Sequence, residues 1–273
     1  MALRPVESVA RSPLPWPMAF YTGLWRRWTD ASPVPDLLIG AGHRTHGSLL
    51  AARRACGGRI IVLMRPSLPL GLFDLCLIPE HDTPPNRSNV LATRGALNRI
   101  QPSQTLDPGL GLLLIGGPSA HFGWDAAALL RQIAAIVAAD PPLSWTLTTS
   151  RRTPAEFLEG LRPLADERLQ VVPVAETGPD WLPAQLARAG QVWVTADSVS
   201  MIYEALTAGA AVGVLATPCR RPSRVSRGLE RLAAEGWVTP FADWRPDRML
   251  HRPPGIFNEA ARCARWIVER WFA

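Results

Sequence analysis

The sequence predicts an α/β protein built from two parallel β-sheets. Three observations carry this prediction: short apolar runs of strand length, helical segments that alternate with them, and an interruption that divides the pattern into two series. The interruption is the segment 101–110 (QPSQTLDPGL), which has no periodicity and contains two prolines, as a linker would. Strands that alternate with helices are joined by right-handed crossovers, so we expect them to be parallel. A chain of 273 residues is long enough for two such domains.

The first series precedes the linker. We expect strands at 36–40, 59–64, 73–78 and 89–92, and a helix at 48–56. In such sheets ligand-facing loops follow the carboxyl ends of the strands, which selects His43 after the first strand and His81 and Asp82 after the third. Imidazole and a perturbed carboxylate titrate near neutrality, so these three residues are candidate general bases. For His43 the structural alternative is that it caps the following helix.

The second series follows the linker. We expect strands at 112–115, 145–149, 169–172, 192–195 and 211–215, and helices at 126–139, 154–161, 181–189 and 200–207. A further helix should end at Ala234, and a last one should span 255–272. The last helix has an apolar stripe, formed by Phe257, Ala260, Ala264, Ile267, Val268 and Trp271. We therefore expect it to dock against another part of the protein.

The segment 191–215 (QVWVTADSVSMIYEALTAGAAVGVL) holds the strongest candidate binding site. A turn with Asp197 and Ser198 joins a buried strand to a helix, so small hydroxyl side chains and free backbone N–H groups from Ser198 to Ser200, Val199 included, face any phosphate bound there. Glu204 lies one turn deeper on the face of Ser200, where its carboxylate could accept hydrogen bonds from two ribose hydroxyls. The alternative is structural: Ser198 caps the helix, Ser200 begins it and Glu204 is a solvated helix residue.

Two other strand ends add candidate donors for a phosphate. The first is the glycine-rich loop Gly116-Gly117-Pro118-Ser119, where backbone can approach a ligand closely, although a simple turn would look the same. The second is Thr149-Ser150-Arg151 with the following arginine, where hydroxyls precede two guanidinium groups, as in a diphosphate clamp. An exposed helix start is the alternative for the second.

Composition limits the function classes. The net charge of +6 is carried by arginine, because the sequence has no lysine, and arginine suits phosphate and carboxylate ligands. The arginines are spread along the chain without a nucleic-acid-binding motif, so we expect no nucleic-acid partner. The four cysteines have no metal-site spacing, and we expect neither a metal nor a cofactor.

The first 36 residues are proline-rich, and their start lacks the secretory pattern, so we expect a cytoplasmic protein. The same segment carries aromatic and basic side chains that suit an anionic membrane surface, namely Trp16, Trp25, Arg26, Arg27 and Trp28. Peripheral contact with the inner membrane is one interpretation. Packing of these side chains on their own domain is the other.

Five motifs together carry a family resemblance. They are PEHD at 79–82, NVLATRGALNRI at 89–100, IGGPSAHFGWD at 115–125, TTSRRTP at 148–154 and VTADSVSMIYEA at 194–205. In this order, over about residues 13–272, the chain resembles the plant "elongated mitochondria" fission factor and its bacterial relatives, which are described as candidate glycosyltransferases. Five motifs in register are far more specific than any one of them.

The resemblance implies a GT-B-like architecture, with two Rossmann-like domains that face each other across a cleft. The implied parts are an acceptor-side domain at 1–106, a nucleotide-sugar-binding domain at 107–250, and a C-terminal helix at 251–273 that packs back towards the first domain. Members of the family usually begin with one more strand and helix carrying a DG-[KR]-x-GH-x-x-Q motif, which this chain lacks; a mis-called start codon is one cause. Ala196 also replaces a usual acidic residue, and His43 a common arginine.

Three functions are compatible with these observations. The first is transfer of a sugar from a nucleotide diphosphate-sugar to a cell-envelope acceptor, a lipopolysaccharide or another glycolipid or polysaccharide, with Arg151, the Gly116-Gly117 loop and the Ser198–Ser200 backbone neutralising the leaving diphosphate. The second is a non-catalytic, membrane-associated interaction protein. The third is a nucleotide-sugar epimerase, because hexosamine epimerases share the two-domain architecture.

Overall fold

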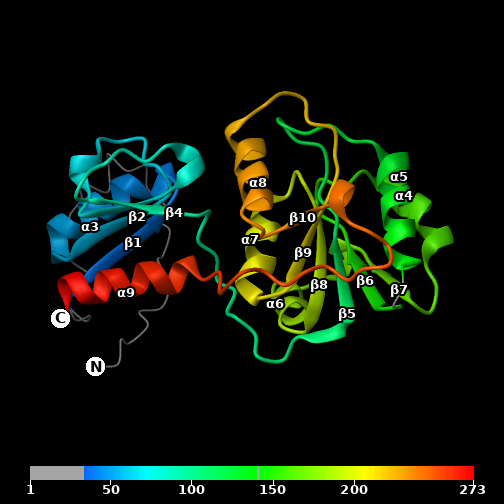
Figure 1. Cartoon of the computed structure of the whole chain (residues 1–273). Coiled ribbons are helices and arrows are strands. Elements are labelled where there is room, and N and C mark those ends of the chain that lie inside the picture. The colour runs from blue at the N-terminus through cyan, green and yellow to red at the C-terminus, as the bar shows by residue number, and fades with distance from the viewer. Residues whose placement is uncertain (1–33, 140–141) are drawn as a thin grey trace. The chain divides into compact units, whose positions relative to one another are not determined.

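The computed structural model describes residues 34–139 and 142–273 (Figure 1). The chain divides into two compact units between Arg94 and Gly95, and each unit contains one parallel sheet. The prediction of an α/β protein with two Rossmann-like, parallel-stranded domains is therefore confirmed. The interpretation that the first domain lacks its first strand and helix concerns the region before Val34, which lies outside the described residues, and stays a prediction.

The first unit contains a four-stranded sheet in the order β1-β2-β3-β4. Its strands are β1 (Leu37–Ala41), β2 (Arg59–Leu63), β3 (Leu75–Pro79) and β4 (Val90–Thr93). Helix α3 (His46–Cys56) connects β1 to β2. Three short 3-10 turns are η1 (His43–Thr45) after β1, η2 (Leu70–Leu72) before β3 and η3 (Glu80–Asp82) after β3. Leu49 of α3 packs with Ile60 and Val62 of β2 and with Phe73, which fixes the helix on one face of this sheet.

The second unit contains a six-stranded sheet in the order β10-β9-β8-β5-β6-β7. The strands are β5 (Asp107–Leu114), β6 (Ser144–Thr148), β7 (Leu169–Val172), β8 (Ala189–Thr195), β9 (Ala211–Leu215) and β10 (Thr239–Pro240). All pairs are parallel. The carboxyl ends of β5, β6, β8 and β9 consequently lie at one edge, and the loops that leave them meet there.

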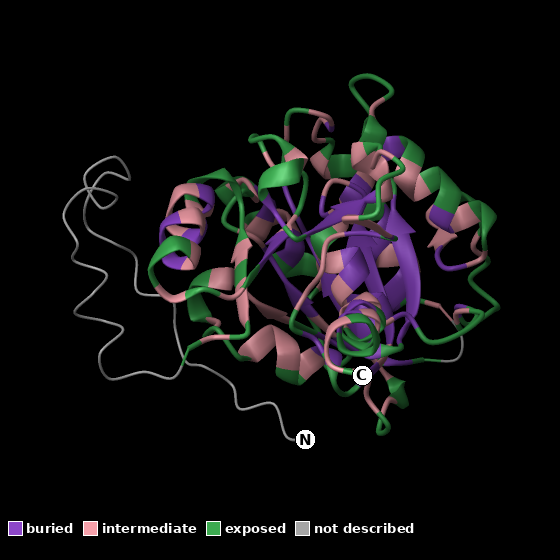
Figure 2. Ribbon diagram, turned by 90° about the vertical axis from the view of Figure 1, so that its left-hand side faces the viewer, coloured by how far each residue is buried: buried purple, intermediate pink, exposed green. Residues whose placement is uncertain are grey.

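Helices cover both faces of this sheet, as parallel strands require (Figure 1). On one side lie α4 (Ala126–Val137) and α5 (Ala155–Leu161); on the other lie α6 (Trp181–Leu186), α7 (Val199–Ala208) and α8 (Arg224–Ala234). The central strands are therefore buried throughout, which Figure 2 shows as purple arrows inside the unit. Trp193 of β8 fits beside Gly213 of β9, where a Cβ atom would lie 2.3 Å from its ring.

The boundary between the units differs from the predicted one at 106/107. The segment after Arg94 packs on α7: Gly95 lies against the ring of Tyr203, and the Asn98 side chain donates to Thr207 Oγ1 at 3.1 Å. Ser103 also donates to the carbonyl of Ala187 at 2.6 Å. The predicted linker is thus largely attached to the second unit, and β5 begins inside it, at Asp107.

The C-terminal helix is shorter than predicted. Helix α9 spans Glu259–Trp271, and the Asn258 side chain caps it by accepting from the N–H of Ala261 at 2.9 Å. Phe257, which we placed on the helical stripe, precedes the helix and stacks on Tyr203 with ring centroids 5.6 Å apart. Within the helix Cys263 and Ile267 are buried, whereas Val268 is 40% exposed. The docking of this helix against the first domain stays a prediction.

Candidate functional site

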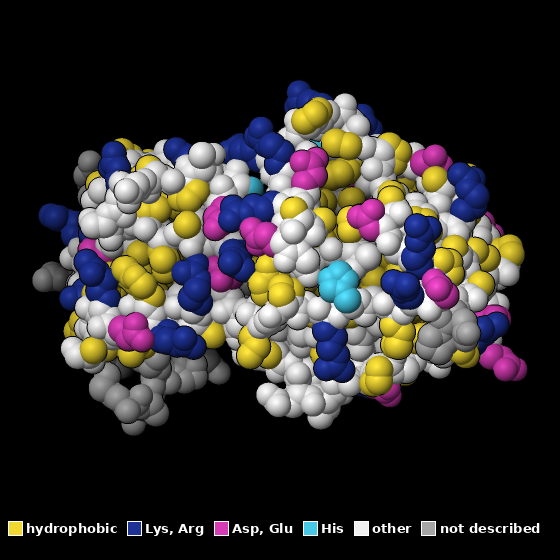
Figure 3. Space-filling model, viewed as in Figure 1, with side chains coloured by type: hydrophobic (Ala, Val, Ile, Leu, Met, Phe, Trp, Pro, Cys, Tyr) yellow, Lys and Arg dark blue, Asp and Glu magenta, His cyan; other side chains and the backbone are white. Residues whose placement is uncertain are grey.

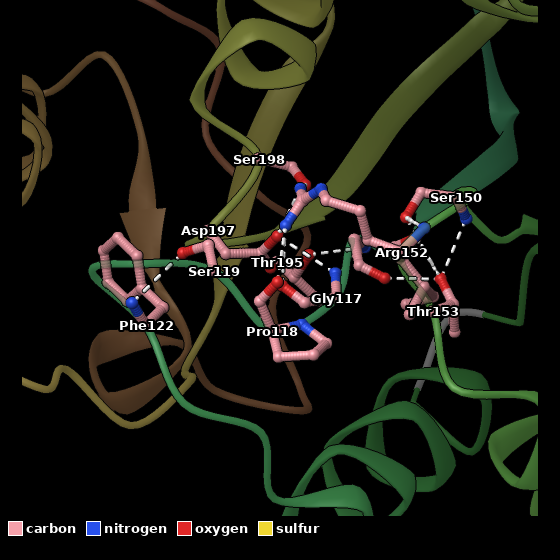
Figure 4. Close-up of polar contacts among 12 residues, drawn as sticks. Gly117, Pro118, Ser119, Phe122, Ser150, Arg152, Thr153, Thr195, Asp197 and Ser198 are labelled. Carbon is pink, nitrogen blue, oxygen red and sulfur yellow. Dashed lines mark hydrogen bonds and ion pairs between the residues drawn. The ribbon is translucent and has the colours of Figure 1, made fainter.

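The carboxyl edge of the second sheet gathers most of the predicted binding residues (Figure 4). Gly117 and Ser119 follow β5, Ser150 and Arg152 follow β6, and Asp197 and Ser198 follow β8 and lead into α7. Three sequence segments that are far apart in the chain are thus brought together. The topology explains this, because β5 lies between β6 and β8 in the sheet.

Asp197 is the centre of this cluster. Its side chain is 0% exposed, and Oδ2 accepts from the N–H of Gly117 at 3.0 Å, from Ser198 Oγ at 3.0 Å and from Arg152 Nη2 at 2.7 Å. Water is excluded from the carboxylate, so the arginine beside it provides the compensating charge. Asp197 therefore joins the three loops from within the protein, and its Oδ2 is already fully used.

Arg152 is occupied in the same way. Nη1 donates to the carbonyls of Gly117 at 2.8 Å and Pro118 at 3.2 Å, and Nη2 donates to Asp197 Oδ2 and, at 3.2 Å, to Ser198 Oγ. Figure 4 shows its guanidinium group directed into this cluster. A guanidinium has five N–H donors, so only the one on Nε is uncommitted. In this arrangement Arg152 holds the loops together and has little capacity left for a phosphate.

Arg151 differs from its neighbour. Its side chain is exposed, and no hydrogen bond or ion pair joins it to any residue in the ranges 34–139 and 142–273. All five of its N–H donors are therefore open to a ligand. Of the two adjacent arginines, Arg151 is the one that can bind an anion without first breaking contacts within the protein.

The glycine-rich loop fits its neighbours closely. A Cβ atom on Gly116 would lie 2.1 Å from Ser198 Oγ, and one on Gly117 would lie 2.2 Å from the carbonyl oxygen of Arg152. The N–H of Gly116 donates to Thr195 Oγ1 at 2.8 Å, and that of Gly117 donates to Asp197. The glycines thus serve close packing of the loops, and their N–H groups are used within the protein.

Free N–H groups occur instead at the start of α7. Ser198 is the N-cap residue, and no side chain caps the helix. The backbone N–H groups of Val199, Ser200 and Met201 have no hydrogen-bond acceptor within the described part of the chain. Together with the positive end of the helix dipole, three such donors favour an anion.

Four buried polar atoms at the same edge lack a partner among the described residues. They are His121 Nδ1 after β5, Thr148 Oγ1 at the end of β6, Asp197 Oδ1 after β8 and Thr217 Oγ1 after β9. Leaving such a group unsatisfied costs about 1–3 kcal/mol, and native proteins keep few of them. Their concentration at four neighbouring strand ends makes this edge the candidate ligand site.

Glu204 lies one turn into α7 and is half-buried. Burial raises the pKa of its carboxyl group above the ordinary value of 4.5, and the positive charge of Arg99 opposes the shift. Arg99 itself donates to the carbonyl of Pro179 at 2.6 Å and lies 3.6 Å from Asp180. A partly desolvated carboxylate at this depth is a strong acceptor for hydroxyl donors.

The remaining predicted residues of this unit shape the loops. Ser119 Oγ accepts from the N–H groups of His121 at 3.3 Å and Phe122 at 3.1 Å. Ser150 accepts at Oγ from the N–H of Arg152 at 3.1 Å, and Thr149 Oγ1 accepts from the N–H of Val174 at 3.1 Å. Their hydroxyls position the backbone, and a role in ligand binding stays a prediction.

The candidate bases of the first unit lie at the carboxyl edge of its own sheet. His43 is exposed in η1, and His81 and Asp82 are half-buried in η3. One intervening strand, β2, separates the two groups, so their backbones lie about 10 Å apart. The catalytic role of His43, His81 and Asp82 stays a prediction.

Backbone strain occurs at this carboxyl edge of the first sheet. Met64 after β2 and Thr83 after η3 have φ angles of +76° and +53°, which non-glycine residues rarely adopt. Arg65 bridges the two strand ends, because Nη1 donates to the carbonyls of Asp82 at 2.8 Å and Thr83 at 3.1 Å. Strain that surrounding contacts maintain is common at ligand sites.

His46, in contrast, is a packing residue. It is 4% exposed, its ring lies 5.3 Å from that of Phe73, and Ser67 Oγ lies 3.4 Å from its Nδ1. Burial, with a smaller contribution from His43, lowers the pKa of its imidazole.

Several residues of the site were missed from sequence. The sequence places Arg152 only as the second arginine of the predicted clamp, and it does not select Thr153, Thr195 or His121. Thr153 Oγ1 bonds to the carbonyl of Gly116 and accepts from the N–H of Ser150 at 2.9 Å. The signal was present in the motifs TTSRRTP and IGGPSAHFGWD, which contain all but Thr195.

Two features are absent from the ranges 34–139 and 142–273. No group of three or more His, Cys, Asp or Glu side chains there is arranged to hold a metal ion. None of the helices in those ranges is long and apolar enough to cross a lipid bilayer. A groove of about 440 Å³ lies elsewhere, between β6, β7 and α6, and Thr146, Gln170 and Trp181 are among its lining residues.

The comparison with protein families decides the relationship. A family described as mitochondrial fission ELM1 matches residues 3–271. The chain belongs to this family. The resemblance inferred from the five motifs is thereby confirmed, whereas a comparison with curated proteins gave no match.

Two solved structures have a similar fold. A candidate UDP-N-acetylglucosamine 2-epimerase from Listeria monocytogenes has a TM-score of 0.54 and 12% identity, covering 94% of this chain and 78% of that one. A UDP-GlcNAc 2-epimerase from Neisseria meningitidis, bound to UDP-GlcNAc, has a TM-score of 0.50 and 10% identity, covering 85% of this chain and 71% of that one. At these identities the likeness shows the fold alone, a GT-B-like pair of Rossmann-like domains.

Proposed function

We propose that this member of the ELM1 family binds a nucleotide diphosphate-sugar at the carboxyl edge of its second sheet and transfers the sugar to a cell-envelope acceptor. The observation that carries the proposal is the group of four unpartnered buried polar atoms after β5, β6, β8 and β9. A protein tolerates such a cluster where a ligand, or the loop movement that a ligand drives, recovers the lost hydrogen bonds.

Each part of the donor has a matching group. The diphosphate would lie over the free N–H groups at the start of α7, with the open guanidinium of Arg151 beside it. The ribose hydroxyls would donate to the half-buried carboxylate of Glu204. Arg152 and Asp197 would act indirectly, by holding the three loops in the arrangement that presents these groups.

The chemical step would leave a nucleoside diphosphate behind. As the bond between the sugar and the diphosphate breaks, negative charge grows on the leaving oxygen, and Arg151 with the α7 N–H groups would stabilise it. A base on the first unit, from the group His43, His81 and Asp82, would accept the proton of the acceptor hydroxyl. The Neisseria structure, which is bound to UDP-GlcNAc, supports this class of donor.

The test is incubation of the purified chain with radiolabelled UDP-, GDP- and CMP-sugars and a cell-envelope extract. We expect label to enter the lipid or polysaccharide fraction from a diphosphate-sugar, and to be lost with Arg151→Ala and with Glu204→Ala. The CMP-sugars, which have one phosphate, serve as the control. Failure of all diphosphate-sugars to bind or react would contradict the proposal.

Two other outcomes would assign another function. Epimerisation of the sugar without any acceptor would identify an epimerase, the activity by which both structures described above are named. If the Glu204→Ala chain still complements cells that lack the protein, the protein is a non-catalytic interaction protein. Membrane contact through Trp16 to Trp28 lies outside the described residues and stays a prediction.

A further inference from the structure

The loop between β9 and α8, with the first turns of α8, is strongly basic. It carries four exposed arginines within eight residues: Arg220, Arg221, Arg224 and Arg227. The sequence contains no acidic residue between Glu204 and Glu230, so this stretch has a charge of +4, whereas the whole chain has +6. Figure 3 shows Lys and Arg side chains, here all arginine, above α8 in the view of Figure 1.

Three of these four cations are not engaged by other side chains or carbonyls of the described residues. In the described ranges, the side chains of Arg220, Arg221 and Arg227 have no hydrogen bond or ion pair. Further along the same helix the pattern changes, because Arg231 pairs with Glu235 at 2.7 Å. The first part of α8 and the loop before it therefore present uncompensated positive charge to the surroundings.

The arrangement fits an extended array of anions. All four side chains are exposed, so no wall of protein encloses a single phosphate among them. Arg224 and Arg227 are three residues apart and share one face of α8, while Arg220 and Arg221 extend the patch along the loop. Several separate anions on a broad surface can contact such a patch at once.

Backbone contacts fix the patch beside the candidate donor site. The N–H of Arg220 donates to the carbonyl of His121 at 2.9 Å, and that of Gly123 donates to Pro218 at 2.7 Å. Phe122 and Cys219 form a β-bridge between the same two loops. His121 carries one of the unpartnered buried atoms described above, so the basic loop and the site are parts of one local structure.

We propose that this arginine patch, formed by Arg220, Arg221, Arg224 and Arg227, binds a membrane surface rich in anionic lipid head groups. Each cation near such a surface contributes a factor of about five to the affinity, so four give reversible, salt-dependent binding. The carboxyl edge of the second sheet then lies next to the lipid. This proposal goes beyond donor binding and does not depend on it.

The test is co-sedimentation of the full chain with mixed phosphatidylglycerol–phosphatidylcholine vesicles. We expect the Arg220→Ala, Arg221→Ala, Arg227→Ala triple variant to bind about 100-fold more weakly than the unmodified chain. The matched control removes the same charge from three exposed arginines elsewhere, Arg245, Arg248 and Arg252, and should bind almost normally. Melting temperatures establish that both variants fold.

Two additions separate the alternatives. Lysine at the three patch positions should keep most of the vesicle binding, because a diffuse anionic surface recognises charge rather than a guanidinium fork. The melting shift caused by UDP should be the same in the triple variant as in the unmodified chain. If UDP changes the melting temperature of neither chain, that result argues against the donor site and leaves the proposal of membrane binding standing.

Three results would overturn the proposal. The first is equal loss of vesicle binding in the matched control, which would indicate net charge alone. The second is unchanged binding in the triple variant, which would put the contact elsewhere on the chain. The third is saturable binding of inorganic polyphosphate with no binding to vesicles, which would assign the patch to a soluble polyanion.

Discussion

Replacing Arg152 with alanine should destabilise the second unit, whereas the same change at Arg151 should not. Arg152→Ala removes four hydrogen bonds and leaves the Asp197 carboxylate, which is 0% exposed, without its cation. Breaking a fully buried pair costs about 3–5 kcal/mol. The Arg152 side chain is 44% exposed, so water can replace part of it, and we expect a loss of about 2 kcal/mol.

The assay is equilibrium urea unfolding, supported by melting curves. A loss of about 2 kcal/mol corresponds to a melting temperature lower by about 4–8 °C for a unit of this size. Arg151→Ala is the matched control, and its free energy of unfolding should stay within about 0.5 kcal/mol of the unmodified chain. Adding Asp197→Asn to Arg152→Ala should restore part of the loss, because no buried charge then remains. Equal effects of the two arginine substitutions, or no rescue by asparagine, would refute the assignment of roles.

Three further predictions test the site and its surroundings. Gly117→Ala should lower the free energy of unfolding by about 2 kcal/mol or more, because the added Cβ would lie 2.2 Å from a backbone oxygen. Gly228→Ala, on the open face of α8, should raise the free energy of unfolding by about 0.5–1 kcal/mol. Urea unfolding of the two variants measures both changes. Burial raises the pKa of Glu204 above 4.5, so the folded protein holds this proton more tightly than the unfolded chain, and stability falls as pH rises from 4.5 through the folded-state pKa. The stability of Glu204→Gln relative to the unmodified chain should accordingly increase across that window and be constant below it, and an absent pH dependence would contradict the burial argument. Burial raises the pKa of the Cys76 and Cys263 thiols to about 11, so iodoacetamide at pH 8 should modify the exposed Cys219 and leave both of them intact, as peptide mass mapping would show.

The fold could be predicted because the sequence is locally consistent. Strands β7 and β9 have the predicted bounds, since each is an apolar run limited by turn residues. The long strand β5 was harder, because it begins with Asp107, Pro108 and Gly109, which are poor strand formers. Asp107 pairs with Ala189 of β8, and the register shifts between Asp107 and Gly111. The two-residue strand β10 (Thr239–Pro240) carries too few residues for any pattern.

The site was harder to predict than the fold. The motifs selected the right loops, because strand ends and glycine-rich turns are visible in sequence. The different roles of the residues in these loops could not be predicted. Arg151 and Arg152 are adjacent and of the same type, and the contacts of Arg152 with Asp197 and the Gly117 carbonyl distinguish them. The Gly116 and Gly117 N–H groups were expected to face the ligand, yet contacts from β8 and its following turn use both.

The most direct test of the account is calorimetric titration of the nucleoside diphosphates UDP and GDP into the unmodified chain, Arg151→Ala and Arg131→Ala. Arg131 is an exposed arginine on α4 and serves as the control for charge. The account predicts that at least one nucleotide binds the unmodified chain and Arg131→Ala equally well, and Arg151→Ala about ten-fold or more weakly, because a charge-assisted contact with the diphosphate is lost. Equal binding to Arg151→Ala, or no binding of either nucleotide to the unmodified chain, would contradict it.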